Sequence, residues 1–148
     1  MKSEFNQSKK QGGFTLLEII VVVAIIAILA AYIAPKVAGR VDDARVSKAK
    51  SDIRVLESSL ELYKLDNFSY PSSDQGLSAL TTKPSGAELK NWRKGGYIKK
   101  LSKDPWGNDY QYQFPGTNGE FDIFSLGADA AVGGSDEAAD IGNWNLDS

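Results

Sequence analysis

"GGFTLLEIIVVVAIIAILAAYIA", residues 12–34, decides the architecture of this chain. Residues 14–34 are apolar except for Thr15 and Glu18. A helix of this length spans about 31 Å, close to the hydrocarbon thickness of a bilayer, so we predict a membrane-spanning helix. Glu18 needs an explanation, because an unpaired charged side chain in lipid costs roughly 2.5–3.5 kcal/mol on insertion scales.

The residues before this segment predict its orientation. Residues 1–13 are short, polar and basic, and positive charge beside a hydrophobic span keeps that end in the cytoplasm. A secretory signal would carry an A-x-A cleavage site after the apolar run, and no two alanines there stand two positions apart. Small residues stand before the run instead, at Gly12 and Gly13. A cut at this point would leave the hydrophobic helix on the protein.

Two absent residue types exclude several classes of function. The chain has no cysteine and no histidine. It can therefore form no disulfide, and it lacks the residues of serine–histidine triads, cysteine proteases and zinc hydrolases. Enzymes built on carboxylate or Ser–Lys pairs remain possible, but no motif indicates one. No basic patch alternates with aromatic residues, which argues against nucleic-acid binding.

Residues 35–66 predict an amphipathic stem helix. Apolar side chains recur at steps of three and four, and charged side chains fill the other positions. Residues 15–66 are expected to form one nearly continuous helix of about 78 Å. Pro35 and Gly39 predict a kink or a locally melted stretch, unless Pro35 only marks the membrane exit. The predicted stripe contains Val37, Val41, Ala44, Ile53, Leu56, Leu60 and Tyr63, with Ala49 one step off the rhythm.

Residues 67–148 predict a small α+β head. The segments "YQYQFP" (110–115) and "FDIFSL" (121–126) flank the turn formers "GTNG", a pattern that favours an antiparallel hairpin. Earlier in the head, within residues 67–84, Asp74 is expected to be the N-cap of a short helix that ends before Pro84. The three tryptophans, Trp92, Trp106 and Trp144, are expected to pack in the core or at its edge.

Negative charge is concentrated towards the C-terminus. All 17 lysines and arginines precede residue 104, whereas nine of the 19 acidic residues lie in 104–148. The loop "LGADAAVGGSDEAAD" (126–140) offers hard oxygen ligands, and its glycines allow backbone carbonyls to face an ion. It lacks the EF-hand pattern. A solvated acidic loop and a cation site both fit these residues. The side chains that could bind a cation are Asp129, Ser135, Asp136, Glu137 and Asp140.

"GGFTLLEIIVVVAIIAILAA" resembles the class III signal peptides of type IV pilins and type II secretion pseudopilins. The resemblance implies that a prepilin peptidase cleaves after Gly13 and N-methylates the new first residue, Phe14. It also implies that Glu18 pairs with the Phe14 amine of a neighbouring subunit and sets the register of a filament. The spacing alone leaves two other readings, in which Glu18 approaches its own Phe14 amine or reaches the headgroups.

The head resembles the major pseudopilins of type II secretion in "YPSSDQGLSAL", "DPWGNDYQY" and "FSLGADAAVGGSDEAADIGNW". The resemblance implies a type IV pilin-like α+β fold, with the long helix packed on a small antiparallel sheet. Family members without cysteine use calcium in their C-terminal loop. The implied ligands are the side chains of Asp129 and Asp136 and the Leu126 carbonyl, with Ser135 as a further ligand; a carbonyl within 130–132 is a weaker candidate, as is Asp140.

The function implied by this resemblance is structural. A non-enzymatic subunit would sit in the inner membrane, with a cytoplasmic N-terminus and a periplasmic head, and polymerise into a filament that helps folded proteins leave through the outer membrane. The implied partners are further copies of the chain, minor pseudopilins, an inner-membrane platform with its ATPase and, indirectly, a secretin. The alternatives are a type IV pilin or competence pseudopilin that builds a surface fibre, and an anchored periplasmic enzyme or binding protein.

Overall fold

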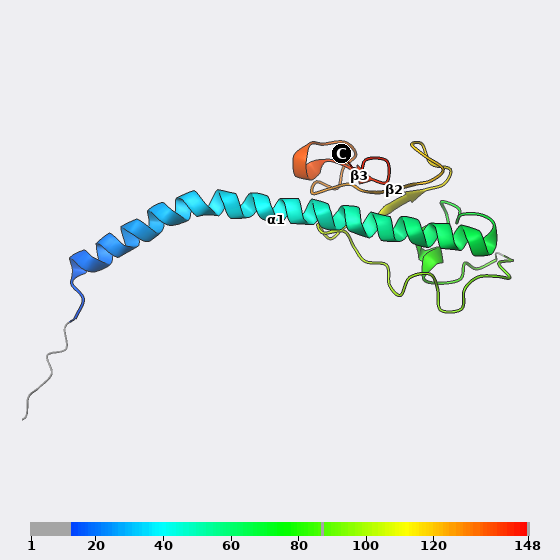
Figure 1. The fold of residues 1–148 in the computed structure, drawn as a ribbon, viewed down its shortest axis with the longest axis horizontal. Coiled ribbons are helices and arrows are strands. Elements are labelled where there is room, and N and C mark those ends of the chain that lie inside the picture. The colour runs from blue at the N-terminus through cyan, green and yellow to red at the C-terminus, as the bar shows by residue number, and fades with distance from the viewer. Residues whose placement is uncertain (1–12, 87, 148) are drawn as a thin grey trace, which may run out of the picture. The chain divides into compact units, whose positions relative to one another are not determined.

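The computed structural model describes residues 13–86 and 88–147 of the chain. The chain divides into two compact units, one up to Arg40 and one formed by Val41–Ser148. The long helix α1, Leu16–Asn67, contributes residues to both units (Figure 1).

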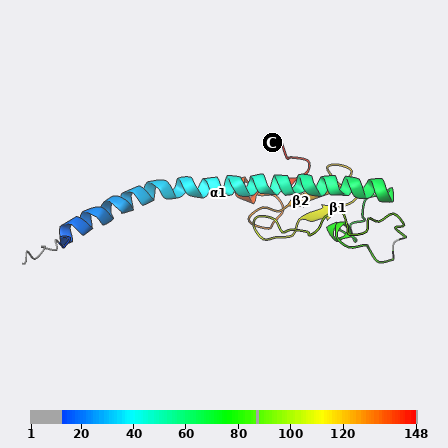
Figure 2. The ribbon, with the colours of Figure 1, turned by 60° about the horizontal axis from the view of Figure 1, so that its bottom comes forward.

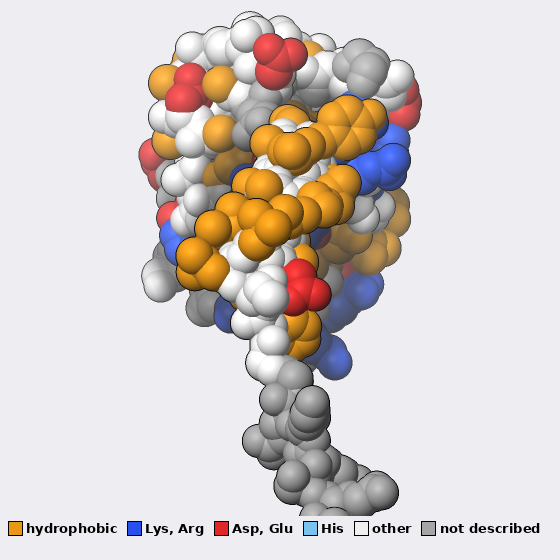
Figure 3. Space-filling model, turned by 90° about the vertical axis from the view of Figure 1, so that its left-hand side faces the viewer, with side chains coloured by type: hydrophobic (Ala, Val, Ile, Leu, Met, Phe, Trp, Pro, Cys, Tyr) orange, Lys and Arg blue, Asp and Glu red, His pale blue; other side chains and the backbone are white. Residues whose placement is uncertain are grey.

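In the first unit, the apolar side chains of α1 are exposed over the whole segment before Pro35. The exposed fraction is 81% for Leu16, 71% for Ile28 and 51% for Ile33. Figure 3 shows this hydrophobic surface at the N-terminal end of α1, with an acidic side chain in it. Within the described residues, α1 is the one helix long and apolar enough to cross a membrane. No other described residue covers its apolar surface before Pro35.

The helix continues without interruption past Pro35 and Gly39. Pro35 cannot donate the usual backbone hydrogen bond, and glycine weakens a helix by about 1 kcal/mol relative to alanine. The turns on both sides nevertheless remain helical. The expected locally melted stretch is therefore wrong for this structure of a single chain, whereas the expected kink stays a prediction.

In the second unit, α1 buries a narrow stripe against the head. The stripe starts later than predicted, because Val41 and Ala44 are exposed whereas Ala49 is fully buried. From Ala49 onward the buried positions follow steps of four and three, which keep one helix face towards the core. The side chain of Val37 lies outside the described residues. The buried stripe consists of Ala49, Ile53, Leu56, Leu60 and Tyr63.

The head contains a three-stranded antiparallel sheet in the order β1-β2-β3. The strands are β1 (Gln111–Gln113), β2 (Asp122–Ser125) and β3 (Ile141–Gly142). Tyr112 pairs with Ile123, which confirms the predicted hairpin, and Ser125 pairs with Ile141. The hairpin and the buried stripe of α1 share one hydrophobic core, and β1 and β2 lie alongside α1 in Figure 2.

The segment after α1 differs from the prediction. A short 3-10 helix, η1 (Leu77–Leu80), follows Gly76, and Asp74 does not cap it. A turn is held instead by Ser72 and Gln75, because the Ser72 N–H donates to Gln75 Oε1 at 3.0 Å and the Gln75 N–H donates to Ser72 Oγ at 3.3 Å. This reciprocal pair has the S-x-x-Q spacing of a capping box. Trp92 and Trp106 pack against the core, and Trp144 lies over Phe124, as expected for packing residues.

Candidate processing segment and acidic loop

Residues 13–15 lead into α1 and carry the predicted cleavage point. Phe14 is 83% exposed. A Cβ added at Gly13 would meet nothing within 4 Å, so packing in the folded chain does not require glycine there. The family resemblance supplies another reason for glycine, since a residue without Cβ can be drawn extended into a protease site.

Thr15 and Glu18 form a reciprocal hydrogen-bonded pair at the start of α1. Glu18 Oε2 accepts from the Thr15 N–H at 3.1 Å and from its hydroxyl at 3.2 Å, and the Glu18 N–H donates to Thr15 Oγ1 at 3.2 Å. This arrangement is a capping box, and a carboxylate in the first turn also interacts favourably with the helix dipole. The T-x-x-E spacing of a capping box is present in the sequence and is the signal that could have predicted Thr15 as the partner of Glu18.

The capping box gives Glu18 hydrogen-bond donors but no cationic side chain among the described residues. No lysine or arginine within residues 13–86 and 88–147 forms an ion pair with it, and the ion pairs of this part of the chain all lie in the second unit. Glu18 is therefore held by neutral donors at the first turn of an exposed apolar helix.

The acidic loop, residues 126–140, is closed at its base by the pairing of Ser125 with Ile141. Ala130 and Asp136 both have a φ of 54°, a positive value that residues other than glycine rarely adopt. At Gly134, which also has a positive φ of 79°, an added Cβ would clash with the Ala138 carbonyl oxygen. Only glycine fits this position, so the loop has a defined conformation around its glycines.

The acidic side chains of this loop differ in their surroundings. Asp129 Oδ1 accepts from the Ala131 N–H at 3.0 Å, and Asp140 Oδ2 accepts from the Gly133 N–H at 2.9 Å. Asp140 Oδ1 is buried and has no hydrogen-bond partner within the described residues. Asp136 is exposed in the 3-10 turn η2, Asp136–Ala138. The side chain of Glu137, a candidate ligand in the sequence, lies outside the described part.

The donor chemistry of this loop fits calcium, which prefers carboxylate, carbonyl and hydroxyl oxygens. The described residues contain no group of three or more acidic side chains that could hold a metal ion. A cation bound here would therefore need backbone and hydroxyl oxygens beside its carboxylates. Leu126 and Ser135 provide such oxygens in the same loop as Asp129 and Asp136.

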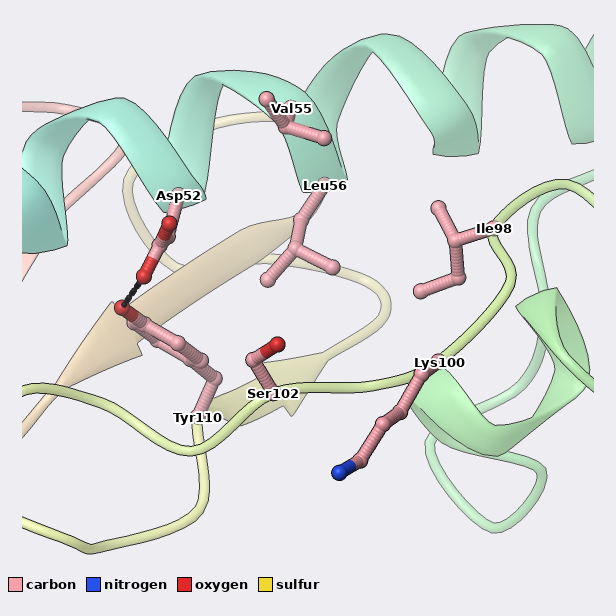
Figure 4. A pocket seen from close by; sticks show the side chains of 7 residues that line it. All are labelled: Asp52, Val55, Leu56, Ile98, Lys100, Ser102 and Tyr110. Atoms are coloured by element: carbon pink, nitrogen blue, oxygen red, sulfur yellow. Dashed lines mark hydrogen bonds between the residues drawn. The ribbon is translucent and has the colours of Figure 1, made fainter.

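A cavity of about 130 Å³ lies between α1 and residues 98–110 in the second unit (Figure 4). The Tyr110 hydroxyl donates to Asp52 Oδ2 at 3.0 Å across it, and Lys48 pairs with the same carboxylate. Burial and the Asp52 carboxylate raise the pKa of Tyr110. The cavity is smaller than typical ligand sites of about 300–1,000 Å³, and its polar pair joins the loop to the helix. The lining residues are Asp52, Val55, Leu56, Ile98, Lys100, Ser102 and Tyr110.

Comparison with known proteins assigns the architecture. A family model described as type II secretion system (T2SS), protein G, matches residues 36–144, and a model of the prokaryotic N-terminal methylation motif matches residues 8–34. The type II secretion system core protein G of Pseudomonas aeruginosa is 59% identical over 140 residues, which cover 94% of this chain and 99% of that protein. The chain belongs to the type II secretion system protein G family.

Two further comparisons support the assignment to the protein G family. The core protein G of Vibrio cholerae is 56% identical over 138 residues, which cover 93% of this chain and 94% of that protein. The crystal structure of the major pseudopilin from the type 2 secretion system of enterohaemorrhagic Escherichia coli matches with a TM-score of 0.64 at 47% identity. The match covers 72% of this chain and 92% of that one, and it confirms the predicted pilin-like α+β fold.

As a member of the protein G family, the chain is a pseudopilin subunit of the type II secretion system. The family is structural, and it favours this function over a surface fibre or an anchored enzyme. The methylation motif includes the predicted cleavage point and Glu18, and the apolar helix indicates a membrane-anchored protein.

Proposed function

We propose that this chain is a non-enzymatic filament subunit whose polymerisation depends on neutralising Glu18. It is inserted in the inner membrane with a cytoplasmic N-terminus, cleaved after Gly13 and N-methylated on Phe14. Copies then leave the membrane and form a periplasmic filament that drives folded proteins through the outer membrane. The observation that carries this proposal is the Glu18 carboxylate, which has no ion-pair partner within residues 13–86 and 88–147 and lies on an exposed apolar segment of α1.

Cleavage supplies the missing positive charge. The new terminus at Phe14 carries an ammonium group, and the pKa of such groups is about 7.7–8.0 in water. Glu18 faces this end of the helix, because Thr15 holds one of its carboxylate oxygens there. In an apolar filament core an unpaired carboxylate is strongly disfavoured, whereas a paired one is tolerated.

The charge pair also provides a register. If the Phe14 amine of one copy meets Glu18 of its neighbour, a shifted arrangement leaves both charges buried without a partner. The apolar surfaces of residues 14–34 can pack in many ways, but few of these ways satisfy the pair. The apolar helices therefore hold the subunits together, and the pairing of Glu18 sets their register.

The proposed partners follow from this cycle. A prepilin peptidase processes the chain, an inner-membrane platform with its ATPase extracts it from lipid, and minor pseudopilins accompany it in the filament. The secretin acts indirectly, as the outer-membrane exit. Nucleic acid is not part of this function.

Calcium is proposed as the cofactor of the acidic loop. The side chains of Asp129 and Asp136, the Leu126 carbonyl and Ser135 would hold it. The cation would neutralise carboxylates that otherwise repel one another and would stabilise the loop between β2 and β3. The hard-oxygen donors, the Gly134 turn and the unpartnered Asp140 Oδ1 in this loop support the proposal.

Mass spectrometry of the mature chain tests the central proposal. The expected N-terminus is N-methylated Phe14. A chain that keeps Met1, or that begins elsewhere without methylation, would contradict the proposed cycle before any question of assembly arises.

A further inference from the structure

A buried carboxylate outside the acidic loop is linked to the loop's first peptide. Asp104 is 4% exposed, lies 21 residues before Ser125 in the sequence, and has no ion-pair partner within the described residues. Its Oδ1 accepts from the N–H groups of Trp106 at 3.0 Å and Asn108 at 2.8 Å. These bonds fix the carboxylate within its own turn.

The second oxygen of Asp104 sets the direction of the Ser125 hydroxyl. Ser125, the last residue of β2, is fully buried, and its Oγ donates to Asp104 Oδ2 at 2.6 Å. An ionised carboxylate only accepts, so the hydroxyl hydrogen must point to it. The Ser125 Oγ lone pairs are then available, and they accept from the Gly127 N–H at 3.1 Å.

The Gly127 N–H belongs to the same peptide group as the Leu126 carbonyl. In a planar trans peptide the N–H and the C=O point in opposite directions. Because the N–H faces buried Ser125, the Leu126 carbonyl faces the other way. The Asn108 side-chain amide also donates to the Gly127 carbonyl at 3.4 Å, so the next peptide is held from the same turn.

We infer that Asp104, acting through Ser125, is a positioning residue that orients the Leu126 carbonyl as a calcium ligand. The inference rests on the calcium site proposed above, and it assigns a role to two residues outside the proposed ligand set. When residues that hydrogen-bond to metal ligands and orient them are removed, metal affinity commonly falls by about 10–100-fold.

Asp104→Asn tests the direction of the hydrogen bonds with little change in size. The amide oxygen can still accept from Trp106 and Asn108, but its NH₂ group then donates to Ser125, where the carboxylate accepted. Ser125→Ala removes the link altogether. For both variants of the mature full-length chain in detergent micelles we expect calcium affinity, measured by calorimetry, to fall at least about tenfold.

Asp122→Asn is the matched control. Asp122 is 3% exposed and lies on the same strand, but it accepts from the Thr117 N–H at 2.8 Å and from Asn118, in the turn between β1 and β2. We expect this variant to lose thermal stability in EGTA and to keep its calcium affinity. If Asp122→Asn weakens calcium binding as much as Asp104→Asn does, general destabilisation explains the effect and the inference is overturned.

Two further measurements test the Asp104–Ser125 hydrogen bond separately from calcium binding. If Asp104 acts through Ser125, the double variant binds calcium no more weakly than Ser125→Ala alone; additive losses contradict the link. Amide exchange of Gly127, followed by NMR in EGTA, is expected to speed up at least about tenfold in Asp104→Asn, the factor for 1.4 kcal/mol of lost protection, and to stay unchanged in Asp122→Asn. Unchanged exchange in Asp104→Asn overturns the inference. If the wild-type chain binds no calcium, the proposed metal site and the ligand role of Leu126 both fall, whereas the exchange result still decides whether Asp104 orients this peptide.

Discussion

Glu18 Oε2 lies 3.1 Å from the backbone nitrogen of Thr15 and 3.2 Å from its hydroxyl oxygen. The carboxylate therefore caps the helix and, at the same time, stays at the end of the chain that cleavage would expose. One T-x-x-E spacing thus explains how an acid is held in place in an apolar segment. The neutral donors satisfy its hydrogen bonding, but they leave its charge for another group to neutralise.

Glu18→Gln should separate capping from charge. Glutamine also serves in a capping box, so the start of α1 is expected to remain helical and cleavage after Gly13 to proceed. Without the negative charge, the Phe14 ammonium would be buried unpaired, and we expect filament yield to fall at least about tenfold, the factor for 1.4 kcal/mol. Mass spectrometry measures processing, and sedimentation with electron microscopy measures filaments. Glu88→Gln, at an exposed loop position in the head, is the control; normal filaments from Glu18→Gln would contradict the pairing.

Thr15 should matter through its hydroxyl. Thr15→Ala removes one donor to Glu18 and the acceptor for the Glu18 N–H, a loss of about 1 kcal/mol for a typical cap. We expect fewer filaments than wild type but more than from Glu18→Gln, because the charge remains. Thr15→Ser keeps the hydroxyl and should assemble normally. Equal yields from the alanine and serine variants would show that the hydroxyl does not position Glu18.

The sequence predicted those parts of the fold that local patterns determine. The hairpin follows from alternation around a turn, and the buried stripe follows from helical spacing. The start of the stripe could not be read from spacing, because Val41 and Ala44 fit the rhythm but have no head residues to cover them. Ala49 is fully buried in the core shared with the head, which depends on partners distant in the sequence.

The missed contacts are of two kinds. Ser72–Gln75 and Thr15–Glu18 have the spacing of a capping box, so both pairs could have been predicted from the sequence. The Asp104–Ser125 bond could not be found, because no periodicity links residues of a turn and a strand that meet only in the folded head. The two-residue strand β3 is likewise too short for a sequence pattern and depends on pairing with β2.

Chelation of calcium should destabilise the head. At a calcium concentration of about 100 times the Kd, binding adds about 2.7 kcal/mol to the free energy of unfolding. For a domain of this size EGTA should therefore lower the Tm by about 10 °C, as measured by calorimetry of the mature chain. The double variant Asp129→Asn, Asp136→Asn should have a lower Tm than the wild type, and EGTA should not change that Tm. A wild-type Tm that ignores EGTA would contradict a calcium site in this loop.

Alkaline pH should unfold the head through its buried tyrosines. Burial is the main cause that raises the pKa of Tyr63, Tyr70, Tyr97, Tyr110 and Tyr112 above the ordinary value. A raised pKa in the folded state means that the unfolded chain loses its protons first. Stability is therefore complete below about pH 10, the unfolded value, and falls as the pH rises above it.

Tyr110→Phe should make this fall less steep. Each tyrosine that stays protonated in the folded state contributes at most about 1.4 kcal/mol per pH unit to the slope. Removing the Tyr110 hydroxyl takes away one such group and its hydrogen bond to Asp52. The free energy of unfolding of the variant should therefore be lower at pH 8 and should fall less steeply with pH above pH 10. Guanidinium titrations of the mature chain from pH 8 to 11.5 measure both quantities. Parallel curves for the two proteins would show that Tyr110 ionises as readily in the folded state as in the unfolded one.

Leu60 and Leu65 provide the same substitution in two environments on one helix. Leu60 is fully buried in the stripe against the head, whereas Leu65 is 72% exposed. Leu60→Ala removes packed methyl groups and leaves a cavity, so we expect a loss of about 2–5 kcal/mol in the free energy of unfolding. Leu65→Ala should change this free energy by no more than about 0.5 kcal/mol. Guanidinium unfolding with an unchanged m-value measures both losses, and equal losses would contradict the assigned core face of α1, because helix propensity is the same for the two changes.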